Sequence, residues 1–139
     1  MTVLKLAEKL AEPSRFLIVD DEIEVCTGLA RGLAKLGCTA KVVHSGAAAI
    51  EAIQQERFSG VLLDIRMKGL TGIDVIREMR RLKIDVPVLI VTGFPNEEVY
   101  QLIDTYGALA VIVKPFSITE LTDTLKRYFS IFNVRYLKA

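Results

Sequence analysis

The chain has 139 residues, of which 51% are hydrophobic and 25% charged, and its formal net charge is +1. This length and composition predict one compact domain without room for a second, and they exclude a disordered or polyanion-binding chain. No apolar stretch approaches the roughly 20 residues that span a bilayer, and charged side chains interrupt residues 2–12, unlike the core of a secretion signal. We therefore expect a cytoplasmic protein that binds neither membranes nor nucleic acid directly.

Both ends of the chain differ in pattern from its middle. Apolar side chains recur on one helical face of residues 2–12 and Pro13 ends the pattern, which predicts an amphipathic helical extension over residues 1–13. Residues 130–139 are aromatic and basic, and they are expected to form a second extension that packs against the core or leads toward a partner. The domain itself is expected over residues 14–129.

Between these extensions, short apolar runs alternate with segments of helical spacing. Runs rich in Val, Ile and Leu predict buried strands, and apolar residues recurring every three or four positions predict helices. The expected strands are 16–20, 39–44, 60–64, 87–92 and 109–113, and the expected helices are 24–36, 46–57, 72–82, 96–106 and 117 onward. Strict alternation predicts an α/β fold with a doubly wound, five-stranded parallel sheet and helices on both faces. The strand over 39–44 is the most polar, so we expect it at an edge.

Three residues that often carry chemistry are expected to have no such role here. Cys26 and Cys38 lack the spacing of a redox or metal site, so they are expected to be reduced, partly buried thiols. His44 is the only histidine and is expected to be a surface residue at the end of the edge strand.

Four of the five predicted strands end in a polar residue that can handle a phosphoryl group. Asp20-Asp21 ends the first strand, Asp64 the third, Thr92 the fourth and Lys114 the fifth. In an open α/β sheet, ligands bind beyond the carboxyl ends of the strands, so these side chains are expected to meet. Three carboxylates, a hydroxyl and an ammonium suit a divalent metal ion together with a phosphoryl group. Two carboxylates about 5 Å apart repel by roughly 3 kcal/mol at an effective dielectric near 20, so Mg²⁺ is expected to stabilise the protein.

In these features the chain resembles the receiver domain of bacterial two-component response regulators over about residues 14–129. The similarity includes the acidic pair after the first strand, Asp64-Ile65-Arg66-Met67 after the third, Gly72 opening the next helix, Thr92-Gly93, and Lys114-Pro115-Phe116. The motifs occur in order and each follows a strand. The resemblance implies a flavodoxin-like sheet with strand order 2-1-3-4-5 and a cis peptide bond between Lys114 and Pro115.

The resemblance also implies a role for each polar residue. Asp64 is expected to accept a phosphoryl group from a histidine kinase or a histidine phosphotransfer protein. Mg²⁺ is expected to be bound by Asp21, Asp64 and the backbone carbonyl of Arg66, with Asp20 acting mostly through a metal-bound water. Thr92 and Lys114 are expected to contact the phosphoryl oxygens.

These roles imply a signalling phosphoacceptor that assists its own phosphorylation and dephosphorylation rather than an enzyme. The downstream partner is expected to be a protein effector or a missing output domain. A homodimer through the helix over 96–106, the strand over 109–113 and the final helix is possible in this family.

Four positions depart from the commonest pattern of the family. Val111 stands where an aromatic side chain usually reports the movement of the threonine, and Lys68 replaces a common proline. Arg66 and Phe94, two positions beyond Asp64 and Thr92, lie where the family controls the access of water. Their bulk favours a shielded aspartyl phosphate.

Two other functions compete with this interpretation. A receiver-like interaction module could keep the fold and signal without phosphorylation, although the five polar residues argue against it. A hydrolase of the haloacid dehalogenase type also uses an aspartate, a hydroxyl and a lysine. Its nucleophile belongs to an Asp-x-Asp motif after the first strand, usually with a cap domain, and the chain shows neither feature.

Overall fold

The computed structural model describes residues 14–129 and Phe132. The expected helical extension over residues 1–13, and the 130–139 extension apart from Phe132, lie outside the described residues. The strands are β1 (Arg15–Val19), β2 (Thr39–Val43), β3 (Gly60–Asp64), β4 (Val88–Thr92) and β5 (Ala110–Val113). The helices are α2 (Ile23–Lys35), α3 (Gly46–Gln55), α4 (Gly72–Arg81), α5 (Glu97–Tyr106) and α6 (Ile118–Tyr128).

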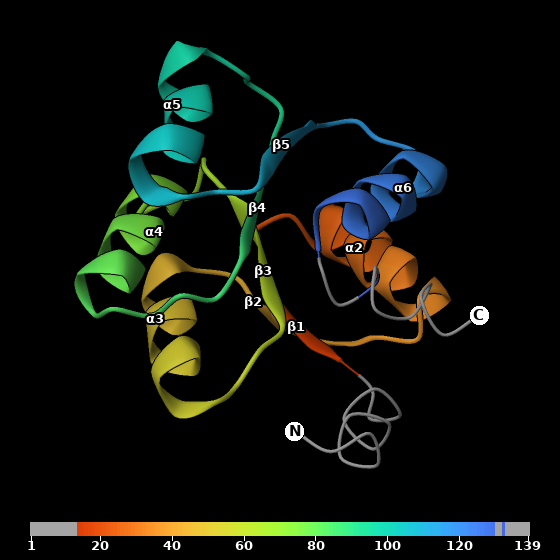
Figure 1. Ribbon diagram of the computed structural model, residues 1–139, viewed down its shortest axis with the longest axis horizontal. Coiled ribbons are helices and arrows are strands. Elements are labelled where there is room, and N and C mark those ends of the chain that lie inside the picture. The colour runs from red at the N-terminus through yellow and green to blue at the C-terminus, as the bar shows by residue number, and fades with distance from the viewer. Residues whose placement is uncertain (1–13, 130–131, 133–139) are drawn as a thin grey trace.

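The five strands form one parallel sheet in the order β2-β1-β3-β4-β5, so the predicted doubly wound fold is confirmed. Figure 1 shows the sheet between two layers of helices, with α3, α4 and α5 on one face and α2 and α6 on the other. The expectation that β2 is an edge strand is also correct. None of the described helices combines the length and the apolar character that a membrane crossing requires.

The burial of the strands explains their continuous apolar runs in the sequence. Every residue of β3 and β4 is buried, because helices cover both faces of the sheet at these central strands. Helices α3 to α6 begin at side chains that accept from free backbone N–H groups, such as Ser45 before α3 and Asn96 before α5. The observed boundaries agree with the predicted ones to within two residues, which is the usual uncertainty at element ends.

Aromatic rings close the amino-terminal edge of the sheet. The ring of Phe16 packs edge-on against Phe129, with centroids 5.1 Å apart, and lies nearly parallel to Phe132 at 6.2 Å. Gly60 leaves room for these rings, because a Cβ atom there would lie 2.3 Å from the Phe129 ring. Phe132 is 3% exposed, so at least this residue of the 130–139 extension packs against the core.

The register of the strands brings distant residues together at the carboxyl-terminal edge. Val19 is aligned with Val43 of β2 on one side and with Leu63 of β3 on the other. Asp20, the residue that follows β1, is therefore flanked by the residues that follow these two partners, His44 and Asp64. Thr92 is aligned with Val113, so Lys114 follows at the same edge.

Gly72 lets α4 begin directly against the strand end that carries Asp64. Its N–H donates to the carbonyl of Ile65 at 3.0 Å, and a Cβ atom at this position would lie 2.2 Å from the carbonyl oxygen of Asp64. Because that neighbour is backbone, it cannot rotate away as a flexible side chain could.

We therefore expect Gly72→Ala to lower the free energy of unfolding by about 2 kcal/mol, the typical cost of overpacking. Gly28→Ala in α2 is the matched control, because a Cβ atom added at Gly28 would meet no neighbouring atom within 4 Å and alanine is the better helix former. Urea unfolding of both variants measures the difference. Equal stabilities would show that the α4 start does not depend on close approach to Asp64.

Candidate functional site

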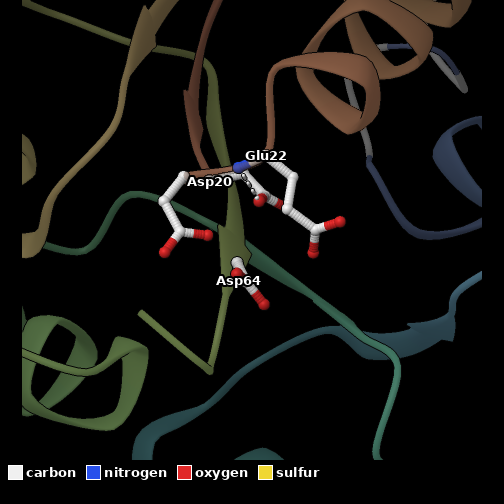
Figure 2. Close-up of side chains that lie close together, drawn as sticks. Asp20, Glu22 and Asp64 are labelled. Atoms are coloured by element: carbon white, nitrogen blue, oxygen red, sulfur yellow. Dashed lines mark hydrogen bonds between the residues drawn. The ribbon is translucent and has the colours of Figure 1, made fainter. Parts of the chain in front are cut away.

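Two carboxylates at neighbouring strand ends are withdrawn from water. Asp20 follows β1 and is 0% exposed, and Asp64 ends β3 and is 2% exposed. Figure 2 shows both side chains, together with Glu22, gathered where these strands end. Asp20, Asp21, Glu22 and Asp64 each offer a carboxylate oxygen, and these four atoms lie within 4.8 Å of one another. We call these four residues the acidic cluster.

The ammonium group of Lys114 compensates part of this negative charge. Its Nζ lies 2.9 Å from Asp20 Oδ2, 3.1 Å from Glu22 Oε1 and 3.5 Å from Asp64 Oδ1. Burial lowers the pKa of Lys114, but the contacts with Asp20 and Asp64 outweigh burial and raise its pKa above the ordinary value. The lysine is therefore a fixed cation, opposed by four carboxylates.

Asp20 and Asp64 differ in how their oxygens are satisfied. Asp20 Oδ1 accepts from the backbone N–H of Glu22 at 2.9 Å, and Oδ2 faces Lys114. Asp64 Oδ1 accepts from the N–H of Arg66 at 3.3 Å. Asp20 Oδ2 and Asp64 Oδ2 are both buried without a hydrogen-bond partner among the described residues, but only Asp20 Oδ2 has the Lys114 ammonium as an ion-pair partner. A buried carboxylate oxygen without a partner is costly. Oxygen ligands that are close together, acidic and in part unsatisfied fit a hard cation such as Mg²⁺.

The pKa of Asp64 is raised to about 6, first because the group is buried and second because the Asp20 carboxylate is close. Lys114 and the N–H of Arg66 act in the opposite direction and offset only part of this increase. Asp64 is therefore ionised at neutral pH, and the folded protein bears the cost of keeping it so.

Thr92 and Lys114 are joined through their backbones at the ends of β4 and β5. The N–H of Lys114 donates to the carbonyl of Thr92 at 2.8 Å, and Thr92 is 1% exposed. The Thr92 hydroxyl accepts from the N–H of Phe94 at 3.1 Å. The peptide bond between Lys114 and Pro115 is cis, as the resemblance implied.

Arg66 and Phe94 form a contact over the loops that follow β3 and β4. The Arg66 guanidinium lies 3.9 Å from the centroid of the Phe94 ring, within the range of a cation–π interaction. Phe94 remains 58% exposed, so the pair forms part of the surface beside the acidic cluster. Beside Lys114, a surface cavity of about 480 Å³ is lined by Val25, Phe94 and Phe116 among others.

The structure thus brings together four of the expected residues and adds one that was missed. Asp20, Asp21, Asp64 and Lys114 lie together, and Thr92 adjoins Lys114. Glu22 was not predicted, although three acidic residues in succession were a visible signal. Glu22 precedes α2 at the capping position, yet its side chain caps no backbone N–H and faces Lys114 instead.

The two cysteines and the histidine behave largely as expected. Cys26 and Cys38 are buried and are not joined by a disulfide. Burial raises the pKa of Cys26 to about 11, with a further contribution from Asp20, so its thiol is not a nucleophile at neutral pH. His44 is exposed, but its ring contacts the backbone of Asp20, which the sequence did not indicate.

Comparison with known proteins agrees with this geometry. Residues 16–126 match the response regulator receiver domain family, so the chain belongs to this family. The chain is 34% identical over 111 residues to the transcriptional regulatory protein ZraR of Escherichia coli, an alignment that covers 80% of the chain and 25% of ZraR. It is 31% identical over 114 residues to sporulation initiation phosphotransferase F of Bacillus subtilis, covering 82% of the chain and 92% of that protein.

A solved structure extends the comparison to the site. The receiver domain of the sensor histidine kinase PA1611 from Pseudomonas aeruginosa superimposes with a TM-score of 0.76 at 25% identity, covering 86% of this chain and 99% of that one. That structure has a magnesium ion coordinated in its active-site cleft. The chain spans about a quarter of the length of ZraR, so what the whole of ZraR does is not transferred to it.

The raised pKa of Asp64 leads to a pH-dependent stability. Between about pH 4 and pH 6 the folded protein binds more protons at Asp64 than the unfolded chain does, so the free energy of unfolding falls as the pH rises through this window. In EDTA, Asp64→Asn should therefore be more stable than wild type at pH 7.5, by up to about 3 kcal/mol for a shift of about two units. The gain should shrink markedly at pH 4.5.

Urea unfolding at the two pH values measures this change. Asp123→Asn, at an exposed carboxylate on α6, is the matched control. A gain from Asp64→Asn that is the same at pH 4.5 and pH 7.5 would contradict the proposed cost of ionising Asp64.

Proposed function

We propose that the chain is a phosphoacceptor that switches its contacts with other proteins when Asp64 is phosphorylated. The observation that carries this proposal is the buried Asp64 carboxylate with one unpartnered oxygen, next to a second buried carboxylate and Lys114. Membership of the receiver family supports it. The chain would act as a signalling phosphoacceptor that promotes its own phosphorylation and dephosphorylation, rather than as an enzyme with a separate substrate.

The acidic cluster is the proposed Mg²⁺ site. Asp21 and Asp64 would supply carboxylate oxygens, Arg66 its backbone carbonyl, and Asp20 a contact through a metal-bound water. The bound ion would neutralise charge that develops on the transferred phosphoryl group. The spacing of the four carboxylates and the unpartnered oxygen of Asp64 support this assignment.

The proposed transfer uses Asp64 as the nucleophile. An Asp64 oxygen forms a bond to phosphorus, and the phosphorus–nitrogen bond of a phosphohistidine breaks with its electron pair leaving on the imidazole. Lys114 is already held within 3.5 Å of Asp64, so its ammonium can contact the phosphoryl oxygens after a small movement. Thr92 would donate a hydrogen bond from its hydroxyl to a phosphoryl oxygen, while the hydroxyl oxygen can still accept from the N–H of Phe94.

The donor is proposed to be a histidine kinase or a histidine phosphotransfer protein. The cavity beside Lys114 has an apolar lining contributed by Val25, Phe94 and Phe116. A partner that brings a phosphohistidine to the site could bind in this cavity. Because kinases draw on ATP, a chain phosphorylated in this way would work in the cytoplasm.

The output surface is proposed to be formed by α5, β5 and α6. Tyr100 and Val113 are large exposed apolar side chains on this part of the molecule, so a protein effector, an output domain or a second copy of the chain could bind there. Val111 is half-buried against the core on the α5 side. A β-branched valine has few rotamers, so we infer that the signal travels through the Thr92–Phe94 loop rather than through a swinging ring.

Incubation with MgCl₂ and acetyl phosphate should add the mass of one phosphoryl group, which hydroxylamine or base removes. Asp64→Ala should abolish the addition, because it removes the carboxylate that is proposed to be the nucleophile. Intact-mass spectrometry measures the result, with Asp123→Ala as a control that should be phosphorylated normally. An unmodified wild-type protein would favour the alternative of an interaction module that works without phosphorylation.

Mg²⁺ should raise the melting temperature of the protein, because it relieves repulsion within the acidic cluster. The expected gain is about 1.4 kcal/mol when the free Mg²⁺ concentration is ten times the Kd. Asp21→Ala should remove most of this gain, whereas Glu24→Gln, an exposed carboxylate outside the cluster, should keep it. Equal responses of wild type and Asp21→Ala in a thermal-shift titration would place the metal elsewhere.

A further inference from the structure

The ring of His44 is hydrogen-bonded to the backbone of the acidic cluster. His44 follows β2 and lies opposite Asp20, and its Nδ1 atom is 2.9 Å from the carbonyl oxygen of Asp20. A carbonyl oxygen can only accept, so Nδ1 must carry the proton and donate. Cys26 Sγ also donates to this oxygen, at 3.3 Å, but a thiol is a weak donor.

The His44 imidazole donates a hydrogen bond to a backbone carbonyl that has no N–H partner from β2. The N–H of Asp20 donates to the carbonyl of Val43 at 3.2 Å, which continues the parallel pairing one residue past β1. The next rung of a parallel ladder would be a backbone N–H donating to the Asp20 carbonyl, but β2 ends at Val43 and the chain turns into α3. His44 donates to that carbonyl from its side chain instead.

This contact bears on the carboxylates through the peptide that joins Asp20 to Asp21. The carbonyl of Asp20 belongs to that peptide, so its orientation sets the direction in which both side chains leave the backbone. The carboxylate of Asp20 is in turn fixed by the N–H of Glu22 and by Lys114. The His44 ring therefore holds the backbone of Asp20 and Asp21 through its hydrogen bond to the Asp20 carbonyl.

We propose that His44 is a positioning residue for the Mg²⁺ site: its Nδ1–H group holds the Asp20–Asp21 peptide so that both carboxylates face the metal. This inference rests on the proposed function of the acidic cluster and adds to it a residue that lies outside the matched motifs. The hydrogen bond of His44 is to the backbone of Asp20, so its effect is expected on metal affinity.

Isothermal titration of the full chain with MgCl₂ at pH 8 tests this proposal. His44→Ala should bind Mg²⁺ about three- to tenfold more weakly, the range expected for the loss of one hydrogen bond. His44→Asn should bind within about twofold of wild type, because the amide Nδ2 is attached at the same position along the side chain as the imidazole Nδ1. Thr27→Val is the matched control, since Thr27 lines the same surface cavity as His44 and its hydroxyl donates to the carbonyl of Ile23.

The comparison of alanine with asparagine separates positioning from general stability. Thermal unfolding in EDTA shows whether each variant is folded at the titration temperature, and a structural role alone would not restore Mg²⁺ affinity with asparagine. Wild-type affinity in His44→Ala, or equal weakening in His44→Ala and His44→Asn, would overturn the proposal. Absence of Mg²⁺ binding by the wild-type protein would instead overturn the proposed function of the cluster, and the role of His44 with it.

Discussion

The rest of the site depends on two carboxylates held out of water at adjacent strand ends with one ammonium between them. The ammonium of Lys114 lies closer to Asp20 than to Asp64, by 2.9 Å against 3.5 Å. Asp20 is therefore the better satisfied of the pair, because Lys114 faces its buried Oδ2, whereas the buried Oδ2 of Asp64 has neither a hydrogen bond nor an ion pair among the described residues. Two aspartates thus differ in their surroundings: those of Asp20 stabilise its carboxylate, whereas those of Asp64 leave one carboxylate oxygen free to bind a ligand.

The scaffold around the pair explains why this arrangement persists although it is costly. The fully buried strands β3 and β4 fix the backbone on one side of Asp64, and the start of α4 presses against its carbonyl at Gly72. These contacts come from apolar burial and close backbone packing, which contribute far more to folding than the loss at one carboxylate. The core can therefore hold Asp64 in place while its charge is only partly compensated.

Sequence patterns predicted the fold and most of the site because both depend on burial. Central strands read as unbroken apolar runs, and their polar ends must meet at one edge, so the proximity of Asp20, Asp64 and Lys114 followed from order alone. Glu22 and His44 were missed for a different reason. Their contacts depend on the direction that each side chain takes in the loops beyond the strand ends, which the periodicity of hydrophobic residues does not encode.

The rise in the pKa of Asp64 was also beyond the sequence. It results from the depth of the carboxylate and its distance from Asp20, both of which are properties of the packed molecule. Repulsion between the two groups could be expected from their order in the chain. The extent to which Lys114 offsets this repulsion could not be expected from the sequence, because a difference of a few tenths of an ångström decides which carboxylate the lysine favours.

The stacking of Phe132 on Phe16 places Phe132 at the end of β1 that is distant from the acidic cluster. Phe16 lies at the beginning of β1 and Asp20 follows its end, so the strand separates them by four residues, or roughly 13 Å at the rise of an extended strand. Phe132 therefore lies at the edge of the sheet opposite the carboxylates. Under the proposed function, a partner bound at this edge would be too far away to touch Asp64, and it could respond to phosphorylation only through a change in the helices between the two edges.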